Sequence, residues 1–409
     1  MLMSVDPSFQ NQPVALERAI ALLGTAPNAS AFEQAWARLP SDLARDGQNE
    51  TGLLNVLAAL VLGGAHPLDD ALSFAHMDPP TPWLTWAMSL WTARLNQNLL
   101  HPATAPAARM IEVRVVDWLA PYFGMDGGHM VPGSTVANLT ALWAARDLAD
   151  ISEVAAPDTA HVSVAKAARI LGLAFRPLPT DAHGRLIADA AVNLEQAALV
   201  LVAGSTSTGV IDPLSLAGRA AWTHVDAAWA GPLRLSKAHA WRLNGIERAD
   251  SVALSAHKWL FQPKESALVF FKDTAAAHGA LSFGGAYLAA PNIGVLGSHG
   301  ASAIPLFAML LAWGEAGFAE RIDRCMAAAD SFAAYVVSEP KLELLGAPDT
   351  GVIVWRPKRI DLDAFAAKLP AGLASRTMIT GQPWLRCVAA NPVVDADAVI
   401  AAVRKTLGQ

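Results

Sequence analysis

The stretch WTHVDAAWAG (residues 222–231) and the stretch SVALSAHKWL (residues 251–260) decide the fold of this chain. Each begins with a short run of residues that favour strands, and each leads to a charged side chain, Asp226 in the first and Lys258 in the second. From about residue 130 to 275, such runs alternate with helical patterns. This alternation predicts an α/β fold in which helices cover a mostly parallel sheet, with a ligand site at the carboxyl ends of its strands.

Helical patterns dominate both flanks of this central region. Before it, apolar residues recur at helical spacing near 14–24, 30–39, 52–63, 83–97 and 105–120. After it, a long helical pattern at 304–337 is followed by candidate strands at 342–345, 351–355 and 384–388 and by a last helix at 395–407. We therefore expect an N-terminal helical segment (1–100), a large α/β domain (101–303) and a small C-terminal α+β domain (304–409).

The composition limits the class of protein. Of 409 residues, 53% are hydrophobic and only 16% are charged, which predicts a large packed core. A net charge of -6 provides no electrostatic attraction to nucleic acid. The chain has two cysteines, and its N-terminus lacks a basic start followed by an apolar run, so we expect a cytoplasmic protein.

One uncharged stretch could be mistaken for a membrane span. Residues 279–314 contain no Asp, Glu, Lys or Arg, but Pro291, Pro305 and several glycines interrupt them. A membrane helix needs about 20 predominantly apolar residues. We expect a buried loop and a core helix here, without a membrane, and the loop could also serve as an active-site lid.

The pair formed by Asp226 and Lys258 indicates a cofactor. Lys258 follows Asp226 by 32 residues, at the end of another predicted strand. Many enzymes that use pyridoxal phosphate (PLP) have this arrangement: the lysine amine forms a Schiff base with the cofactor aldehyde, and the carboxylate keeps the pyridine nitrogen protonated. Taken singly, Lys258 could be an ordinary surface lysine and Asp226 a helix cap; together they favour PLP.

Other residues could complete a cofactor site. Gly133-Ser134-Thr135 precedes a helical pattern, where backbone N–H groups and the helix dipole attract phosphate, although an ordinary helix cap has the same pattern. His161 could stack on the cofactor ring, but a lone histidine is more often structural. Further candidate cofactor contacts are His257, Ser255, Ser205 and Ala228. For Ser205 the alternative is a turn rich in local side-chain hydrogen bonds.

Together these motifs resemble the group II PLP-dependent decarboxylases, the family of aromatic amino acid, glutamate and histidine decarboxylases. The matching segments are ANLTALWAARD (137–147), AGSTSTGVIDPL (203–214), HVDAAWAG (224–231) and HKW (257–259). The resemblance runs from about residue 53 to 407. It implies the type I PLP-dependent transferase fold, with a seven-stranded sheet in the large domain, and a homodimer whose subunits share their active sites.

The resemblance also implies roles for individual residues. Lys258 would be the internal aldimine lysine, Asp226 the pyridinium partner and His161 the residue stacked on the ring. Ala228 would pack against the ring. The phosphate would be held by Ser134, Thr135 and His257.

On the substrate side, Tyr287 falls where the family carries a loop tyrosine that protonates the substrate carbon after CO2 leaves. His76 and Asp78 fall where the family shapes its substrate pocket, although both could instead lie in a dimer interface. Arg386 could pair with a substrate carboxylate or form a structural salt bridge. The chain departs from the family pattern at Val136, Val202, Ala256 and His299 and in a short segment after Tyr287.

The expected reaction is decarboxylation of an L-amino acid to its amine and CO2, with no metal ion at the site. Another PLP reaction on the same scaffold is the alternative, such as aldehyde synthesis, carbon–carbon lysis, elimination or transamination. A third possibility is a non-catalytic protein that keeps the fold.

Overall fold

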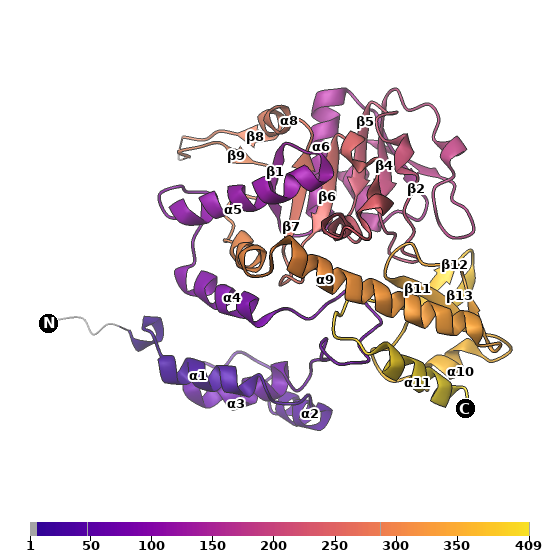
Figure 1. Ribbon diagram of the computed structural model, residues 1–409. Helices are drawn as coiled ribbons and strands as arrows, with labels where there is room; N and C mark the ends of the chain where they lie inside the picture. Colours follow the sequence, from indigo (N-terminus) through magenta and orange to yellow (C-terminus); the bar gives the residue numbers. More distant parts are fainter. Residues whose placement is uncertain (1–5, 47, 287, 409) are drawn as a thin grey trace. The chain divides into compact units, whose positions relative to one another are not determined.

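The computed structural model describes residues 6–46, 48–286 and 288–408, and the chain divides into two compact units, Met1–Pro67 and Leu68–Gln409 (Figure 1). The first unit is helical, with α1 (Pro13–Leu22), α2 (Ala29–Ala37) and α3 (Glu50–Val61). Asparagines begin two of these helices: the side-chain oxygens of Asn28 and Asn49 accept the N–H groups of Ala31 and Gly52, each at 3.0 Å.

A seven-stranded sheet forms the centre of the second unit. Its strands are β1 (Gly127–Val131), β2 (Glu153–Pro157), β3 (Ala174–Leu178), β4 (Ala197–Val202), β5 (Trp222–Asp226), β6 (Ser251–Ser255) and β7 (Ala267–Phe271). The strand order is β1-β7-β6-β5-β4-β2-β3, and β7 is antiparallel to both of its neighbours, whereas the other pairings are parallel. This sheet confirms the predicted mostly parallel fold.

Helices cover both faces of this sheet, which explains why its strands β4, β6 and β7 are buried along their whole length. Along β4, Leu199 and Leu201 pack into the core on one side, while Ala198 and Val200 pack on the other. The helices on the first side are α5 (Pro106–Leu119) and α9 (Ala303–Ser338). Those on the second side are α6 (Ser134–Ala149), α7 (Val162–Ile170) and α8 (Thr274–Ala280).

The C-terminal part contains an antiparallel sheet with the strand order β10-β11-β13-β12. Its elements are β10 (Leu342–Leu344), β11 (Val352–Pro357), α10 (Leu362–Ala366), β12 (Ser375–Ile379), β13 (Gln382–Val388) and α11 (Ala396–Thr406). By length and composition alone, α9 could cross a membrane. However, Phe318, Ile322 and Phe332 of this helix are buried in the protein core, and Gly314 interrupts its helical backbone.

Residues 70–78, near the beginning of the second unit, are bound to the end of the chain. Phe74 donates its N–H to the Gly372 carbonyl at 2.8 Å, and its own carbonyl accepts from the Val388 N–H. The Asn391 side chain donates to the Asp70 carbonyl at 2.9 Å, and the Ser375 hydroxyl donates to the Ala75 carbonyl at 3.0 Å. The following helix is α4 (Trp83–Leu95), and a small hairpin of β8 (Ser282–Phe283) and β9 (Asn292–Ile293) follows α8.

The sequence patterns did not indicate β2, β3, β12, α8 or α10. Strands β2 and β3 have the sequences EVAAP and AFRPL, in which alanine, proline and charged residues weaken the strand signal. Their pairing with each other and with β4 compensates for this low propensity. The domain boundaries expected at residues 100 and 303 stay predictions.

Candidate active site

The carboxyl ends of neighbouring strands meet at one small cavity. Asp226 ends β5, and Lys258 lies in the turn that follows β6, which pairs in parallel with β5. The residues that line the cavity are Ser134, His161, Val202, Gly204, Thr206, Asp226, Ala228, Trp229 and Lys258. The structure therefore brings together five of the predicted site residues from four separate segments of the chain.

Lys258 is largely buried, and burial lowers the pKa of its ammonium group. The negative charge of Asp226 acts in the opposite direction, but burial outweighs it. Removing a charged group from water favours its neutral form. A neutral amine is the form that attacks an aldehyde, so the surroundings of Lys258 suit a nucleophile.

Asp226 is a buried carboxylate whose two oxygens both have a fixed donor. Its Oδ2 accepts from the Asn138 side-chain amide at 2.8 Å, and its Oδ1 accepts from the Ala228 N–H at 3.1 Å. Asn138 comes from the first turns of α6, one turn after Ser134. These two donors hold the carboxylate in one orientation at the end of its strand.

The amide of Asn138 is in turn oriented by His224. Its Oδ1 lies 3.0 Å from His224 Nε2, and His224 Nδ1 lies 2.9 Å from the Ser251 hydroxyl. His224 is fully buried, and burial lowers its pKa to about 4, so the ring is neutral at physiological pH. Because the Asn138 oxygen can only accept, the proton of the neutral ring lies on Nε2. A chain of three residues, Ser251, His224 and Asn138, thus determines where Asp226 points.

His161 is held by the same network. It begins α7, and its Nδ1 accepts from the Ser163 N–H at 3.3 Å and lies 2.8 Å from the Ser163 hydroxyl. That hydroxyl also accepts from the Asn138 amide at 3.0 Å. Burial lowers the pKa of His161, so a neutral ring carries its proton on Nε2.

The other end of the site has unused donors that suit an anion. Helix α6 starts at Ser134, and within the described chain no side chain caps it. The Ser255 hydroxyl is shielded from solvent and has no hydrogen-bond partner among the described residues. His257, next to Lys258, lies with Nδ1 2.9 Å from the Ser266 carbonyl. An uncapped helix start and an unpaired buried hydroxyl fit the phosphate of PLP, just as Lys258 and Asp226 fit its aldehyde and ring nitrogen.

Comparison with known proteins identifies the family. The sequence profile of the pyridoxal-dependent decarboxylase conserved domain matches residues 34–358. The chain belongs to this family. It is a PLP-dependent amino acid decarboxylase, as the sequence motifs implied, and the alternative reactions are not favoured.

Two curated relatives illustrate the similarity. The L-2,4-diaminobutyrate decarboxylase of Rhizobium meliloti (strain 1021) is 30% identical over 388 residues, which cover 83% of this chain and 77% of that protein. The aromatic-L-amino-acid decarboxylase of Bacillus atrophaeus is 25% identical over 355 residues, covering 78% and 74% of the two chains.

Solved structures share the fold of this decarboxylase. The structure of Oryza sativa TDC with PLP and tryptamine matches with a TM-score of 0.86 and 21% identity, covering 100% of this chain and 99% of that one. The glutamate decarboxylase domain of a Vibrio parahaemolyticus protein matches with a TM-score of 0.81 and 24% identity, covering 96% and 93%. At these identities the likeness establishes the fold alone.

Some predicted residues of the decarboxylase lie around the cavity without lining it. Ser205 is buried in the turn after β4, where its hydroxyl lies 2.8 Å from that of Thr208. This hydrogen bond agrees with the alternative given for Ser205, a turn rich in local side-chain hydrogen bonds. Gly133 and Thr135 flank Ser134 at the start of α6, and Ser255 and His257 precede Lys258.

The predicted substrate-side residues come from more distant segments. Arg386 donates to the Thr206 carbonyl at 2.7 Å, which brings the C-terminal sheet to the edge of the cavity. Asp78 forms an ion pair with Lys264, and His76 is exposed. Burial acts to raise the pKa of Asp78, but the hydrogen bond and charge of Lys264 outweigh it and the pKa is lowered. Tyr287 lies outside the described residues.

Two tryptophans pack together beside the cavity that contains Lys258, and one of them, Trp229, lines it. The rings of Trp229 and Trp259 have centroids 4.1 Å apart, and the Trp259 indole donates to the Ala389 carbonyl at 2.9 Å. Gly204 packs against Trp229 at a φ of 92°, and a Cβ there would lie 2.7 Å from the Trp229 ring. Only glycine suits both that backbone conformation and that contact.

Asn138, His224 and Lys264 were not identified as site residues from the sequence. Asn138 follows Ser134 by four residues, so helical spacing alone could have placed both at the same edge. The orienting role of His224 depends on contacts 86 and 27 residues away in the chain. Such contacts leave no local pattern.

Proposed function

We propose that Lys258 is the residue of this decarboxylase that attaches PLP, and that Asp226 pairs with its ring nitrogen. The observation that carries this proposal is their position on one cavity, with both Asp226 oxygens held by fixed donors. When bound, PLP supplies the electron sink that accepts the electron pair left on the substrate α-carbon as CO2 departs. The remaining tasks belong to the side chains of the protein.

Asp226 would keep a proton on the ring nitrogen, because a carboxylate at hydrogen-bond distance stabilises the cationic form. Asn138 and the Ala228 N–H would keep that carboxylate aimed at the ring, with no reorientation during the reaction. His161 would stack on the ring, with its orientation held by Ser163, and Ala228 would pack against the ring.

The phosphate would be held at the start of α6. Ser134, Thr135 and the backbone at Gly133 would donate to it, supported by the positive end of the helix dipole. Ser255 and His257 would complete the contacts from the opposite side, which is supported by the unpaired Ser255 hydroxyl. Ser205, in the turn after β4, would be a further cofactor contact.

On the substrate side, Arg386 would orient the carboxylate of the L-amino acid, with His76 and Asp78 shaping the pocket. The charge of Asp78 acts on both Lys258 and Arg386, which supports their common neighbourhood. Tyr287 would return a proton to the α-carbon. Its replacement by phenylalanine should slow that protonation and increase aldehyde-forming side products.

The reaction is tested by incubating the PLP-loaded protein with a pool of L-amino acids and analysing the pool by mass spectrometry. An amino acid that is replaced by its CO2-depleted amine names the substrate. Lys258→Ala should abolish turnover. Repeated turnover by this variant, or a product that keeps its carboxylate, would contradict the proposal.

The attachment site is tested separately by borohydride reduction. Reduction should fix the cofactor to the peptide that contains Lys258 and remove its absorption band. Lys264→Ala is the control, because this lysine lies nearby but points to Asp78. Labelling that persists in Lys258→Ala and disappears in Lys264→Ala would reassign the attachment site.

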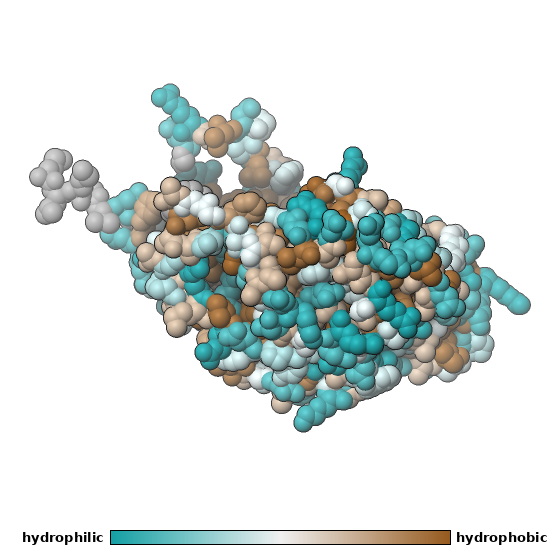
Figure 2. Space-filling view, turned by 90° about the horizontal axis from the view of Figure 1, so that it is seen from above, coloured by the Kyte–Doolittle hydropathy of each residue, from teal (hydrophilic) through white to brown (hydrophobic). Residues whose placement is uncertain are grey.

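The active protein is proposed to be a cytoplasmic homodimer, with no membrane and no nucleic acid as partner, whose subunits share their active sites. Helix α4 supports an interface because it exposes Trp83, Trp86 and Trp91, which is unusual for a monomer. Figure 2 shows apolar side chains interspersed with polar ones on one face of the molecule. Light scattering should give twice the chain mass, and Trp91→Asp should weaken the dimer; a monomeric active enzyme would contradict this.

A further inference from the structure

The turn that follows β4, residues 203–211, forms one wall of the cavity that contains Lys258. Gly204 and Thr206 of this turn line the cavity, together with Trp229 from the segment after β5. Backbone hydrogen bonds within the turn fold it back on itself. Contacts that hold the turn in place therefore also hold this wall of the cavity.

The far end of the turn packs directly against the C-terminal part of the chain. Gly209 has a φ of 71°, and a Cβ there would lie 2.5 Å from the Thr350 hydroxyl oxygen and 2.6 Å from the Val352 Cβ. Both the left-handed backbone and the close contact require glycine at this position. The backbone of the turn thus lies against the beginning of β11 without a side chain between them.

Thr350 is fully buried, and its hydroxyl joins the turn to Trp229. It donates to the Gly209 carbonyl at 2.9 Å and accepts from the Trp229 indole N–H at 3.1 Å. A hydroxyl has one proton to donate, and the indole N–H can only donate, so the direction of both hydrogen bonds is determined. One side chain therefore fixes the distance between two components of the cavity wall.

The residue before Thr350 holds the end of the same turn. Asp349 Oδ2 accepts from the Ile211 N–H at 3.0 Å, and Arg185 from the loop after β3 donates to the same oxygen at 2.5 Å. The side chain of Arg185 is 40% exposed, so this ion pair is partly screened by water. The hydrogen bond from Ile211 is the contact that fixes the backbone of the turn.

The residue after Thr350 packs against the second tryptophan. A Cβ at Gly351 would lie 2.7 Å from the Trp259 ring, whose centroid is 4.1 Å from that of Trp229. The Gly351 carbonyl accepts from the Ala389 N–H at 2.7 Å, and the Trp259 indole donates to the Ala389 carbonyl. Residues 349–351, which we call the clamp segment, thus contact the turn and both tryptophans.

We propose that the clamp segment positions the active-site wall of this decarboxylase, with Thr350 as the positioning residue. Its hydroxyl holds the turn 203–211 and Trp229 at the spacing that the bound cofactor and substrate require. None of the three clamp residues lines the cavity, so they act through the turn and Trp229. The inference rests on the proposed attachment of PLP at Lys258, which makes this cavity the active site.

Arg386 of β13 attaches the tip of the same turn. Its guanidinium donates to the Thr206 carbonyl at 2.7 Å, and β13 pairs with β11, the strand that follows the clamp segment. Neighbouring strands of one sheet therefore hold the turn at its tip and at its base. A displacement of about 1 Å in an active site can reduce the rate by about 10²-fold. Loosening the base should thus slow the reaction while PLP stays attached.

The test compares Thr350→Val with Thr350→Ser in the PLP-loaded enzyme. Valine keeps nearly the same shape but leaves the Gly209 carbonyl and the Trp229 indole N–H without their partner. Release of CO2 from the pool of L-amino acids at saturating concentration should fall at least about tenfold, with the PLP content per chain unchanged. Thr350→Ser restores the hydroxyl and should recover most of the lost rate.

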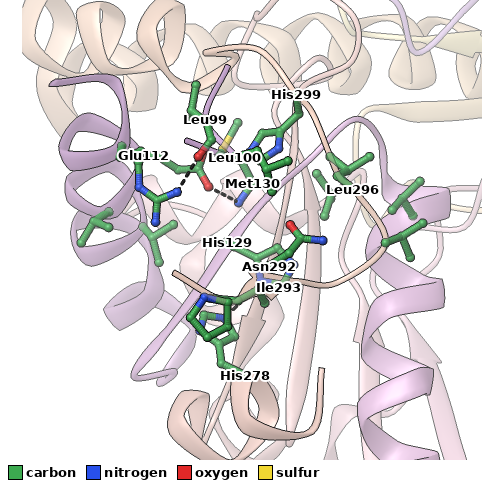
Figure 3. Close-up of a pocket in the computed structure, with 18 residues that line it drawn as sticks. Leu99, Leu100, Glu112, His129, Met130, His278, Asn292, Ile293, Leu296 and His299 are labelled. Carbon is green, nitrogen blue, oxygen red and sulfur yellow. Dashed lines mark hydrogen bonds between the residues drawn. The ribbon is translucent and has the colours of Figure 1, made fainter. Parts of the chain in front are cut away.

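Hydrogen exchange provides a measurement that does not depend on turnover. In the PLP-loaded protein without substrate, the amides of 204–211 should exchange at least about tenfold faster in Thr350→Val than in the wild type. The amides of β1 are the internal reference and should be unchanged. This strand lines a separate cavity with α5 and the segment 291–299 (Figure 3), and the clamp segment contributes no residue to that lining.

Thr223→Val is the matched control. Thr223 is also fully buried, and its hydroxyl accepts from the Gly218 N–H at 3.1 Å, at the end of β5 opposite to Asp226. Its loss should lower the urea midpoint but leave CO2 release and the exchange of 204–211 within about twofold of the wild type. If Thr350→Val fails to fold, Asp349→Ala replaces it, because it removes the acceptor of the Ile211 N–H from a partly exposed position.

The inference is overturned if the variant without the Thr350 hydroxyl releases CO2 at the wild-type rate, or if exchange in 204–211 is unchanged. An equal loss of rate in Thr223→Val would also overturn it, since any buried hydrogen bond would then have the same effect. Failure of Thr350→Ser to recover activity would assign the loss to the methyl group. A wild-type protein without a borohydride-sensitive cofactor band would overturn the proposed function itself, whereas a normal band with an unchanged rate in Thr350→Val would overturn this inference alone.

Discussion

Asp226 and Glu112 are two carboxylates beside the same sheet, and they differ in what compensates their burial. Asp226 has an N–H donor on each oxygen, at 2.8 and 3.1 Å. Glu112 has one weak donor at 3.4 Å, and its other oxygen has none among the described residues. Burial raises the pKa of Glu112, since the neighbouring charges of His299 and Arg109 and the Met130 N–H do not outweigh it.

This difference shows two ways in which a fold can hold a buried acid. At Asp226, the Asn138 side chain from α6 provides a fixed hydrogen-bond donor. His224 in turn holds the Asn138 amide in its orientation. At Glu112 such a donor is missing among the described residues for one of the two oxygens, and burial raises the pKa of the acid. The first arrangement keeps a constant negative charge available for a reaction, whereas the second favours the neutral form of the acid.

The sharpest test of the comparison is Asp226→Asn. This change removes the charge and turns a donor toward the Asn138 amide, so the rate of decarboxylation should fall by roughly 10²–10⁴. Turnover under substrate saturation measures the effect, with cofactor content checked by absorbance. Asp250→Asn is the control, since Asp250 accepts from Thr223 at the other end of β5; an equal loss of rate there would remove the special role of Asp226.

Asn138→Leu should have the next largest effect. It leaves Asp226 Oδ2 and the His224 Nε2 proton without partners in a buried place, at a cost of about 1–3 kcal/mol for each. Urea unfolding measures the loss of stability. Thr140→Val on the same helix is the control, because the Thr140 hydroxyl is buried and already without a partner in the described structure. Similar losses for both variants would mean that Asn138 only fills space.

The lowered pKa of His224 predicts how the free energy of unfolding depends on pH. His224 has a folded pKa of about 4, below its unfolded value near 6.5, because burial favours the neutral ring. Below pH 6.5 the unfolded chain binds a proton that the folded chain does not, so the free energy of unfolding falls as the pH drops from 6.5 toward 4. The slope per histidine reaches about 1.4 kcal/mol per pH unit. His224→Gln should reduce this slope, although His129 and His257 also contribute; an unchanged slope would contradict the assignment.

Glu112→Gln should have the smallest effect, and it should be stabilising. The folded pKa of Glu112 lies above its unfolded value, so its contribution to stability decreases as the pH rises through that unfolded value. Glutamine does not ionise, so the variant does not lose this stability at higher pH. Its free energy of unfolding should therefore equal that of the wild type near pH 4 and exceed it at pH 7, by roughly 1 kcal/mol or less. Thermal unfolding at the two pH values measures the difference, and a variant less stable at pH 7 would contradict it.

The sequence predicted the parts of the molecule whose signal is local. Strand β5 runs from Trp222 to Asp226, in the stretch where the sequence predicted a strand, because its residues favour strands and the small residues after Asp226 do not. Lys258 and Asp226 were recognisable because each directly follows or ends such a run. The family and its cofactor followed from these residues in combination with the other motifs.

The remaining features of the site depend on contacts between residues that are far apart in the chain. Asn138 and Asp226 are separated by 88 residues, and the free oxygen of Glu112 results from where α5 meets β1. Neither a propensity nor a spacing encodes such a meeting.

The hydrogen bonds of residues 70–78 have a consequence for biosynthesis. Their partners, such as Ser375 and Asn391, lie 300 and 321 residues away, near the end of the chain. On the ribosome, this segment emerges early and must wait for nearly the whole protein to be translated before its backbone groups are satisfied. Asp78 belongs to the same segment. A nascent chain could therefore complete its central sheet well before it becomes an enzyme.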